Sequence, residues 1–224
     1  MRVAVIGVAA WVPSVRAFAF RDGLRSRALS MSAEVQKRVL VPIADGSEEI
    51  EFSTIANTLV RGGAKVTVAS VGPDLQVTGS RGIKLVADCP IGDCEGKEWD
   101  LVACPGGMPG ATHLHDSPAL CRIIKQATAA GKKVAAICAA PAVVLSPLGV
   151  LEGRKATGYP APRFIDALAS SYVAGQPVIV DGNIITSQGP ATALPFALKL
   201  VGELFGAEKA QAVATEMLHG VAAA

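Results

Sequence analysis

The sequence is poor in aromatic and charged residues, and its longest apolar run is too short to span a membrane. Aromatic residues make up 4% and charged residues 18% of the 224 residues, whereas 50% are hydrophobic. A chain of this composition is neither disordered nor fibrous. Its length suits one well-buried domain and is short for two. We therefore predict a single domain over residues 37–220, without a membrane anchor.

Motifs that bind phosphate-bearing cofactors are also missing. The turn G-G-M-P-G at 106–110 lacks the G-x-G spacing of a dinucleotide fingerprint, and no P-loop lysine pattern occurs. None of the three histidines lies at an evident strand end, so no Cys-His-Asp triad is indicated. His113 and His115 are expected in a surface loop. We predict that the protein works without a cofactor.

The cysteines form no recognisable metal or redox motif. There are five of them, an odd number, and no two have C-x-x-C spacing. This pattern argues against a zinc cage, a redox dithiol or a disulfide framework. Four are expected to be reduced and mostly buried, and we predict no metal site. The cysteines are Cys89, Cys94, Cys104, Cys121 and Cys138.

The first 31 residues differ in charge from the rest of the chain. They contain five arginines and one acid, which leaves 16 bases and 18 acids, a net charge of −2, for the remainder. No basic surface for nucleic acid is expected from that balance. An Arg-rich, nearly acid-free start interspersed with serine is typical of a transit peptide, so we predict import into a mitochondrion or plastid. A secretory signal and a leader without an address are the alternatives, and Met31 offers a start for a shorter cytoplasmic form.

Short apolar strands alternate with amphipathic helices after the leader. This order predicts an α/β fold with a mostly parallel sheet covered by helices on both faces. The expected strands are 37–44, 64–71, 83–88, 99–107 and 132–138, followed by a hairpin around Asp181-Gly182-Asn183. The expected helices are 48–61, 118–130, one that opens at 139–146, 163–169, one from Pro190 and 207–218.

Cys138 stands at the junction between an apolar strand and a helix. In a parallel sheet, ligands bind beyond the carboxyl ends of the strands, where this junction lies. Free backbone N–H groups and the positive end of the helix dipole would lower the pKa of a thiol there. The same N–H groups can hold an oxyanion, as in a nucleophile elbow. The alternative is that Cys138 is a small core residue.

Three carboxylates occupy the first turn of the helix expected from residue 48. Such acids often do no more than compensate the helix dipole. The apolar stripe of this helix, however, predicts that Glu48 and Glu51 point inward and Glu49 outward. A carboxyl held near the thiol at the sheet edge would be desolvated, so its pKa should rise. It could then exchange protons with a substrate.

The glycines at 106 and 107 follow a strand end. Glycine there permits a positive φ and lets backbone N–H groups approach a ligand, although a plain tight turn would need the same residues.

Several motifs together resemble the ThiJ/PfpI superfamily, in particular the branch of the parkinsonism-associated protein deglycase. The resemblance covers about residues 37–218. It rests on K-R-V-L-V-P-I-A-D-G-S-E-E-I-E, P-G-G-M-P-G-A, A-A-I-C-A-A-P, K-A-T-G-Y-P and T-S-Q-G-P-A-T-A. It implies a flavodoxin-like three-layer αβα sandwich that is usually a homodimer.

The resemblance also implies roles for individual residues. Cys138 matches the reactive cysteine and Glu51 the protonated glutamate beside it, while Gly107 and Ala139 match the backbone donors that face the sulfur. Other matching or neighbouring positions are Gly106, Tyr159 and Pro190 at the substrate pocket and Arg61 and Arg81 near the dimer interface and site.

The chain departs from relatives in this superfamily at three positions. The protease branch has histidine directly after the nucleophile, whereas this chain has Ala139, which disfavours a peptidase. Tyr159 replaces a histidine of the animal deglycases, so a tyrosine hydroxyl is the substitute for any proton shuttle there. Gln188 replaces an arginine of the animal branch.

The resemblance, together with the positions of Cys138 and Glu51, implies an enzyme of the glyoxalase III type. It would convert methylglyoxal to lactate and glyoxal to glycolate without glutathione or metal, with protein deglycase activity as an extension. The alternative is an oxidative-stress sensor or redox-regulated chaperone that uses the same cysteine. A third interpretation keeps the fold and assigns no activity to it.

Overall fold

The computed structural model describes residues 36–220, so the predicted leader at 1–31 and the start at Met31 lie outside the described residues. Seven strands form one sheet in the order β5-β2-β1-β6-β7-β9-β8. Every neighbouring pair is parallel except β8 and β9, which form an antiparallel hairpin. The strands are β1 Arg38–Ile43, β2 Lys65–Ser70, β5 Cys89–Pro90, β6 Leu101–Cys104, β7 Lys133–Ile137, β8 Val178–Asp181 and β9 Ile184–Ser187.

The central strands are apolar on both faces because both faces are covered. In β1, Val39 and Val41 belong to one hydrophobic core, whereas Leu40 between them belongs to the other. This alternation is the two-residue period of a strand, here with apolar side chains on each side. The predicted α/β fold with a mostly parallel sheet is therefore confirmed.

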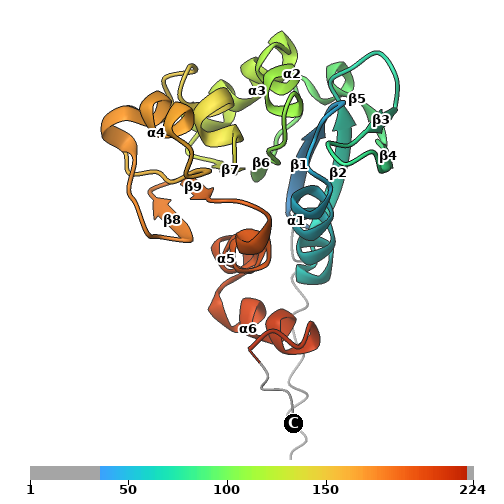
Figure 1. The fold of residues 1–224 in the computed structure, drawn as a ribbon. Coiled ribbons are helices and arrows are strands. Elements are labelled where there is room, and N and C mark those ends of the chain that lie inside the picture. The colour runs from blue at the N-terminus through green and yellow to red at the C-terminus, as the bar shows by residue number, and fades with distance from the viewer. Residues whose placement is uncertain (1–35, 221–224) are drawn as a thin grey trace, which may run out of the picture. The chain divides into compact units, whose positions relative to one another are not determined.

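Helices occupy the two layers outside the sheet. One core contains side chains of α2, α3 and α4, and the other contains side chains of α1, α5 and α6. Figure 1 shows α2 to α4 on one side of the strands and α5 and α6 on the other. None of the helices in residues 36–220 combines the length and apolarity needed to cross a membrane. The helices are α1 Glu49–Gly62, α2 Gly110–His115, α3 Pro118–Ala129, α4 Pro162–Leu168, α5 Ala193–Phe205 and α6 Ala207–Glu216.

The structure differs from the predicted elements in three places. The strand expected at 83–88 is β4 (Lys84–Val86), which pairs with β3 (Gln76–Thr78) in a separate hairpin rather than in the main sheet. The loop expected around His113 and His115 is the short helix α2. The helix expected at 139–146 is a short π-helical segment, η2 (Pro141–Leu145).

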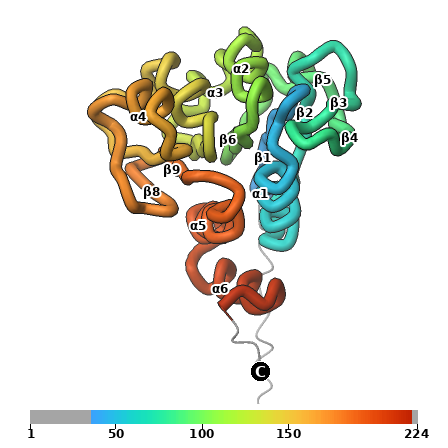
Figure 2. The backbone as a smooth tube through the Cα atoms, in the orientation of Figure 1, coloured from blue at the N-terminus to red at the C-terminus, as the bar shows by residue number. Residues whose placement is uncertain are grey.

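The β3–β4 hairpin is fastened to the start of α1 by Glu49. The Glu49 side chain is 4% exposed, so the prediction that it points outward is wrong. Its Oε1 accepts hydrogen bonds from the backbone N–H groups of Arg81 (2.6 Å) and Ile83 (3.3 Å). Its Oε2 accepts a bond from the Ser80 hydroxyl at 3.1 Å. Figure 2 shows the hairpin near the start of α1.

These hydrogen bonds make the hairpin's attachment depend on pH. Burial raises the pKa of Glu49, but the bonds from Arg81, Ile83 and Ser80 outweigh it and hold the pKa below its usual value. A carboxyl whose pKa is lower in the folded than in the unfolded chain stabilises the fold at pH values above its pKa in the unfolded chain, which is about 4.3. That stabilisation is lost as the pH falls through the folded pKa.

We therefore expect Glu49→Gln to lower the free energy of unfolding at pH 7 by about 1 kcal/mol. The difference from the wild type should shrink on acidification below about pH 4.3, as urea unfolding at several pH values would show. Glu152→Gln, at an exposed position, is the matched control and should change little. A deficit in Glu49→Gln that stays constant down to acid pH would contradict this account.

Candidate active site

Cys138 occupies a strained turn directly after β7. Its φ is +64°, a region that residues with a Cβ rarely adopt. Two backbone hydrogen bonds hold it there: its N–H donates to Ser187 O at 3.0 Å, and its carbonyl accepts from Tyr159 N at 2.8 Å. The turn thus has the geometry of a nucleophile elbow, and the side chain is half-buried rather than enclosed in the core.

Glu51 lies fully buried in the first turn of α1. Glu48 caps the helix and orients this turn, because its Oε2 accepts a bond from Glu51 N at 2.7 Å. The Oε2 of Glu51 in turn accepts from Gly106 N at 2.7 Å. Its Oε1 has no conventional hydrogen-bond partner among the described residues. One oxygen is thus fixed, and the other remains for an exchangeable proton.

Gly106 brings the thiol and the carboxyl together. A Cβ at this position would lie 2.6 Å from Cys138 Cβ and 2.9 Å from Glu51 Oε2, closer than side chains approach in proteins. The absence of a side chain at Gly106 is therefore what lets the end of β6, the elbow and α1 meet at one point.

Two backbone amides face the sulfur. The N–H groups of Gly107 and Ala139 both hydrogen-bond to Cys138 and lower the pKa of its thiol. Gly107 has a φ of +87°, and a Cβ there would lie 2.3 Å from Gly46 O, so only glycine fits. Gly107 and Ala139, which the resemblance identifies as backbone donors, thus lie next to Cys138.

Burial and mutual charge dominate the ionisation of the pair. Burial, then the charge of Glu51, raise the pKa of Cys138 to about 12 despite the two amides. Burial raises the pKa of Glu51 to about 7, against the hydrogen bond from Gly106. The lowered thiol pKa expected from helix amides alone is therefore not found. Because the two groups interact, their protons leave in two steps that belong to the pair, and between the steps it holds one proton and one charge.

A pocket of about 360 Å³ opens onto the sulfur. Of the residues singled out from the sequence, Tyr159 and Pro190 line it, and Arg81 does so from the β3–β4 hairpin. None of the described residues that line it is a histidine. The rest of the lining is Glu48, Ser80, Gly107, Met108, Ala139, Arg163 and Phe164.

Arg163 and Phe164 are pocket residues that sequence reasoning missed. The Tyr159 ring meets the Phe164 ring edge-on, with 6.2 Å between centroids. The Arg163 guanidinium lies 4.4 Å from the same Phe164 ring. Their only sequence signal is a position shortly after T-G-Y-P, which does not reveal that α4 packs beside the elbow. Together they give the pocket an aromatic wall with a positive rim.

Arg61 lies in a different part of the fold. It is in the last turn of α1, where it pairs with Glu216 of α6 and donates to Asn57 Oδ1 at 2.9 Å. It is not among the residues that line the pocket. Arg61 and Arg81 therefore lie in different parts of the fold, although the resemblance placed both near the dimer interface and site.

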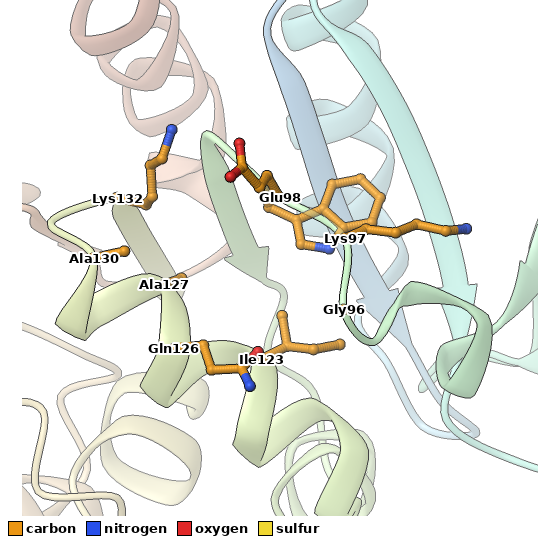
Figure 3. A pocket seen from close by; sticks show the side chains of 9 residues that line it. Gly96, Lys97, Glu98, Ile123, Gln126, Ala127, Ala130 and Lys132 are labelled. Carbon is orange, nitrogen blue, oxygen red and sulfur yellow. The ribbon is translucent and has the colours of Figure 1, made fainter.

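A second pocket, of about 220 Å³, lies beside the amino ends of β6 and β7. Figure 3 shows Lys97, Glu98 and Lys132 around it, with Ile123 and Gln126 contributed by α3. It contains none of the predicted site residues, and it lies at the strand edge opposite the elbow. Within residues 36–220, no three His, Cys, Asp or Glu side chains are grouped so that they could hold a metal ion.

Comparison with known proteins identifies relatives of this chain. The chain is 43% identical to protein DJ-1 homolog A of Arabidopsis thaliana over 83% of its own length, and 35% identical to the glutathione-independent glyoxalase DJR-1.2 of Caenorhabditis elegans over 80%. It covers 47% of the Arabidopsis protein, about half its length, and 94% of the nematode protein.

Solved structures show the same likeness. The oxidised DJ-1 of Toxoplasma gondii is 45% identical, with a TM-score of 0.79 over 82% of this chain and 99% of that one. Drosophila melanogaster DJ-1beta is 39% identical, with a TM-score of 0.78 over 82% and 98%. Residues 37–203 also match the model of the DJ-1/PfpI family. The chain therefore belongs to the DJ-1/PfpI family.

Proposed function

We propose that the protein is a glutathione-independent glyoxalase that converts methylglyoxal to lactate and glyoxal to glycolate. The observation that carries the proposal is the placement of Cys138 and Glu51 around Gly106, with Cys138 lining a small pocket. A thiol and a carboxyl that share one proton supply a nucleophile and an acid–base group at once. The nematode relative named a glutathione-independent glyoxalase supports the assignment.

The reactive form of the pair carries the charge on sulfur and the proton on Glu51; it is the minor form, because the pKa of Cys138 is raised to about 12 and that of Glu51 only to about 7. The half-buried sulfur has two amide donors, and the carboxyl can add its own proton as a third. The carboxylate would have only the Gly106 N–H in a fully buried position. These donors lower the free energy needed to move the charge from the carboxylate to the sulfur.

The reaction then needs only the groups of this site. The Cys138 thiolate attacks the aldehyde carbon of methylglyoxal, and the resulting oxyanion takes up a proton to give a hemithioacetal. The Glu51 carboxylate removes the hydrogen from the former aldehyde carbon, and a proton returns to the neighbouring carbon through an enediol. The product is a lactoyl thioester on Cys138, and water hydrolyses it to lactate and regenerates the thiol. The Gly107 and Ala139 N–H groups stabilise the oxyanions.

The pocket lining fits substrates of this class. Its volume of about 360 Å³ accommodates a three-carbon oxoaldehyde. The positive rim formed by Arg81 and Arg163 suits the carboxylate product. Tyr159, 45% exposed at the pocket, offers a hydroxyl to a bound substrate. The pocket is open, so adducts of oxoaldehydes with protein side chains are further candidates for a deglycase reaction.

Cys138→Ala keeps the Cβ but removes the sulfur. We expect lactate formation from methylglyoxal without glutathione to fall by about a thousandfold or more. Cys121→Ala is the matched control, because Cys121 is also half-buried but lies outside the pocket. Chiral lactate assays on both variants provide the measurement. Turnover near the wild-type level in Cys138→Ala would reject the scheme.

The shared proton predicts the pH profile. The active form has lost one proton of the pair, so kcat/KM should rise as the pH passes through about 7, the value to which the pKa of Glu51 is raised. Glu51→Gln keeps an oxygen for the Gly106 N–H but removes one ionisation, and turnover should fall by about 10²- to 10⁴-fold.

The thiol itself reports on this coupling. Iodoacetamide labelling of Cys138 against pH should show two steps in the wild type and one in Glu51→Gln. A single, identical step in both proteins would show that the carboxyl and the thiol titrate independently.

An oxidative-stress sensor is the second candidate function. It is favoured by the half-buried sulfur with its amide donors, which would stabilise a sulfinate as well as an oxyanion. The structural relative from Toxoplasma gondii is described as oxidised. Lactate production and the mass of the Cys138 peptide after graded peroxide, measured on the same sample, distinguish the two functions. Sulfinate without turnover would favour the sensor.

We further propose that the protein is a homodimer through α1 and the β3–β4 hairpin. Ile50 and Val60 of α1 are 58% and 57% exposed, and Ile83 and Val86 of the hairpin region are 57% and 66% exposed. The bond between Ile83 N and Glu49 joins the hairpin region to the first turn of α1. Exposed apolar side chains gathered on adjacent elements are typical of an interface.

Val60→Asp would place a charge on this apolar surface. We expect it to shift the protein from dimer to monomer, measured by sedimentation equilibrium, with a dissociation constant at least about tenfold higher. Val180→Asp on the edge strand β8, 36% exposed, is the control for a charge placed elsewhere. A wild type that sediments as a monomer, or a Val60→Asp variant that dimerises normally, would contradict this interface.

A further inference from the structure

Cys89 and Cys94 lie together although their spacing resembles no redox motif. The two Sγ atoms are 3.7 Å apart. Cys89 belongs to the two-residue strand β5, and Cys94 ends the 3₁₀ turn η1 (Ile91–Cys94) that follows it. The turn folds the chain back, so that residues five apart meet. Because the two cysteines lack C-x-x-C spacing, the sequence pattern alone does not reveal the pair.

The two thiols differ in their access to solvent. Cys89 is half-buried at the edge of the sheet, whereas Cys94 is 0% exposed. Burial raises the pKa of the Cys94 thiol to about 12, and the contact with Cys89 adds to this effect. An oxidant from solvent therefore meets Cys89 first, while Cys94 stays protected behind it.

The local backbone allows the sulfurs to approach. A disulfide has an S–S distance of about 2.05 Å, so the sulfurs must close by roughly 1.7 Å. β5 is an edge strand that pairs only with β2, over two residues. Gly92 and Asp93 between the cysteines are exposed. A small shift of this turn requires no rearrangement of the central sheet.

We propose that Cys89 and Cys94 form a reversible dithiol site that is oxidised by hydroperoxides to an intramolecular disulfide. The Cys89 sulfur attacks the distal peroxide oxygen, the O–O bond breaks, and the peroxide leaves as water or an alcohol. Cys89 is then a sulfenic acid. The Cys94 sulfur displaces its hydroxyl, which leaves as water, and the S–S bond forms. The two thiols together lose two electrons, and the peroxide gains them.

This site is separate from Cys138. β5 and β7 are four strands apart in the sheet, which corresponds to about 19 Å at the usual strand spacing. Cys138 therefore cannot resolve a sulfenic acid at Cys89, nor can Cys94 resolve one at Cys138. The dithiol does not depend on the proposed glyoxalase reaction, and each can fail without the other.

The experiment is peroxide titration of the full chain followed by thiol mapping. Hydrogen peroxide is raised in steps until Cys121 or Cys138 is oxidised, and remaining thiols are blocked with maleimide. Cleavage before Asp88 and Asp93 then separates the two cysteines, so their peptides remain linked only by a disulfide. We expect the linked peptides in most chains before Cys121 is oxidised, and their separation after treatment with a reductant.

Two variants complete the test. In Cys94→Ser, dimedone should trap Cys89 as sulfenic acid, and irreversible oxidation of Cys89 should rise several-fold. Cys121→Ser, a change at a half-buried cysteine elsewhere, should leave the linked peptides unchanged. Full maleimide labelling of Cys89 and Cys94 in wild-type chains whose Cys121 or Cys138 is oxidised would overturn the proposal. So would disulfide-linked dimers in place of the intramolecular bond.

Discussion

The hydrogen bond from Gly106 N to Glu51 is the contact on which the site depends. It joins the first turn of α1 to the end of β6, and because Gly106 has no side chain, the Cys138 elbow packs against the same point. Burial of the carboxyl raises its pKa to about 7, and this makes one proton available to two groups at neutral pH. A Glu51 exposed to solvent would ionise independently and leave the thiol without an acid beside it. The packing of α1, β6 and the elbow at Gly106 thus determines how Glu51 and Cys138 share a proton.

The central fold and the positions of the two proposed catalytic residues, Cys138 and Glu51, were predictable from the sequence. Strands with apolar residues on both faces, alternating with helices, specify a covered parallel sheet, so β1, β7 and α1 were located within a residue or two. Cys138 follows a strand whose end must lie at the ligand-binding edge. The three-to-four-residue period of α1 places Glu51 inward. These inferences need only local periodicity and the general rules of sheet topology.

The remaining features depend on contacts between residues distant in sequence. Glu49 was expected to face solvent, but the hairpin that covers it belongs to a segment some thirty residues away, as its bond to Arg81 shows. The same limitation hid Arg163, which reaches the pocket because α4 packs beside the elbow. The direction of the Cys138 pKa shift was missed because local amides were visible in the sequence, whereas burial and the charge of Glu51 were not. Tertiary contacts outweigh local ones in all three cases.

The positive φ of Cys138 links reactivity to thermal stability. Holding a side chain with a Cβ at +64° costs free energy, which the surrounding sheet must supply. Glycine would occupy this backbone geometry without strain, yet it would bring no sulfur. The turn therefore costs the domain about 1–3 kcal/mol of stability for as long as it keeps the proposed nucleophile, and efforts to engineer a hardier protein would have to find their gains elsewhere in the chain.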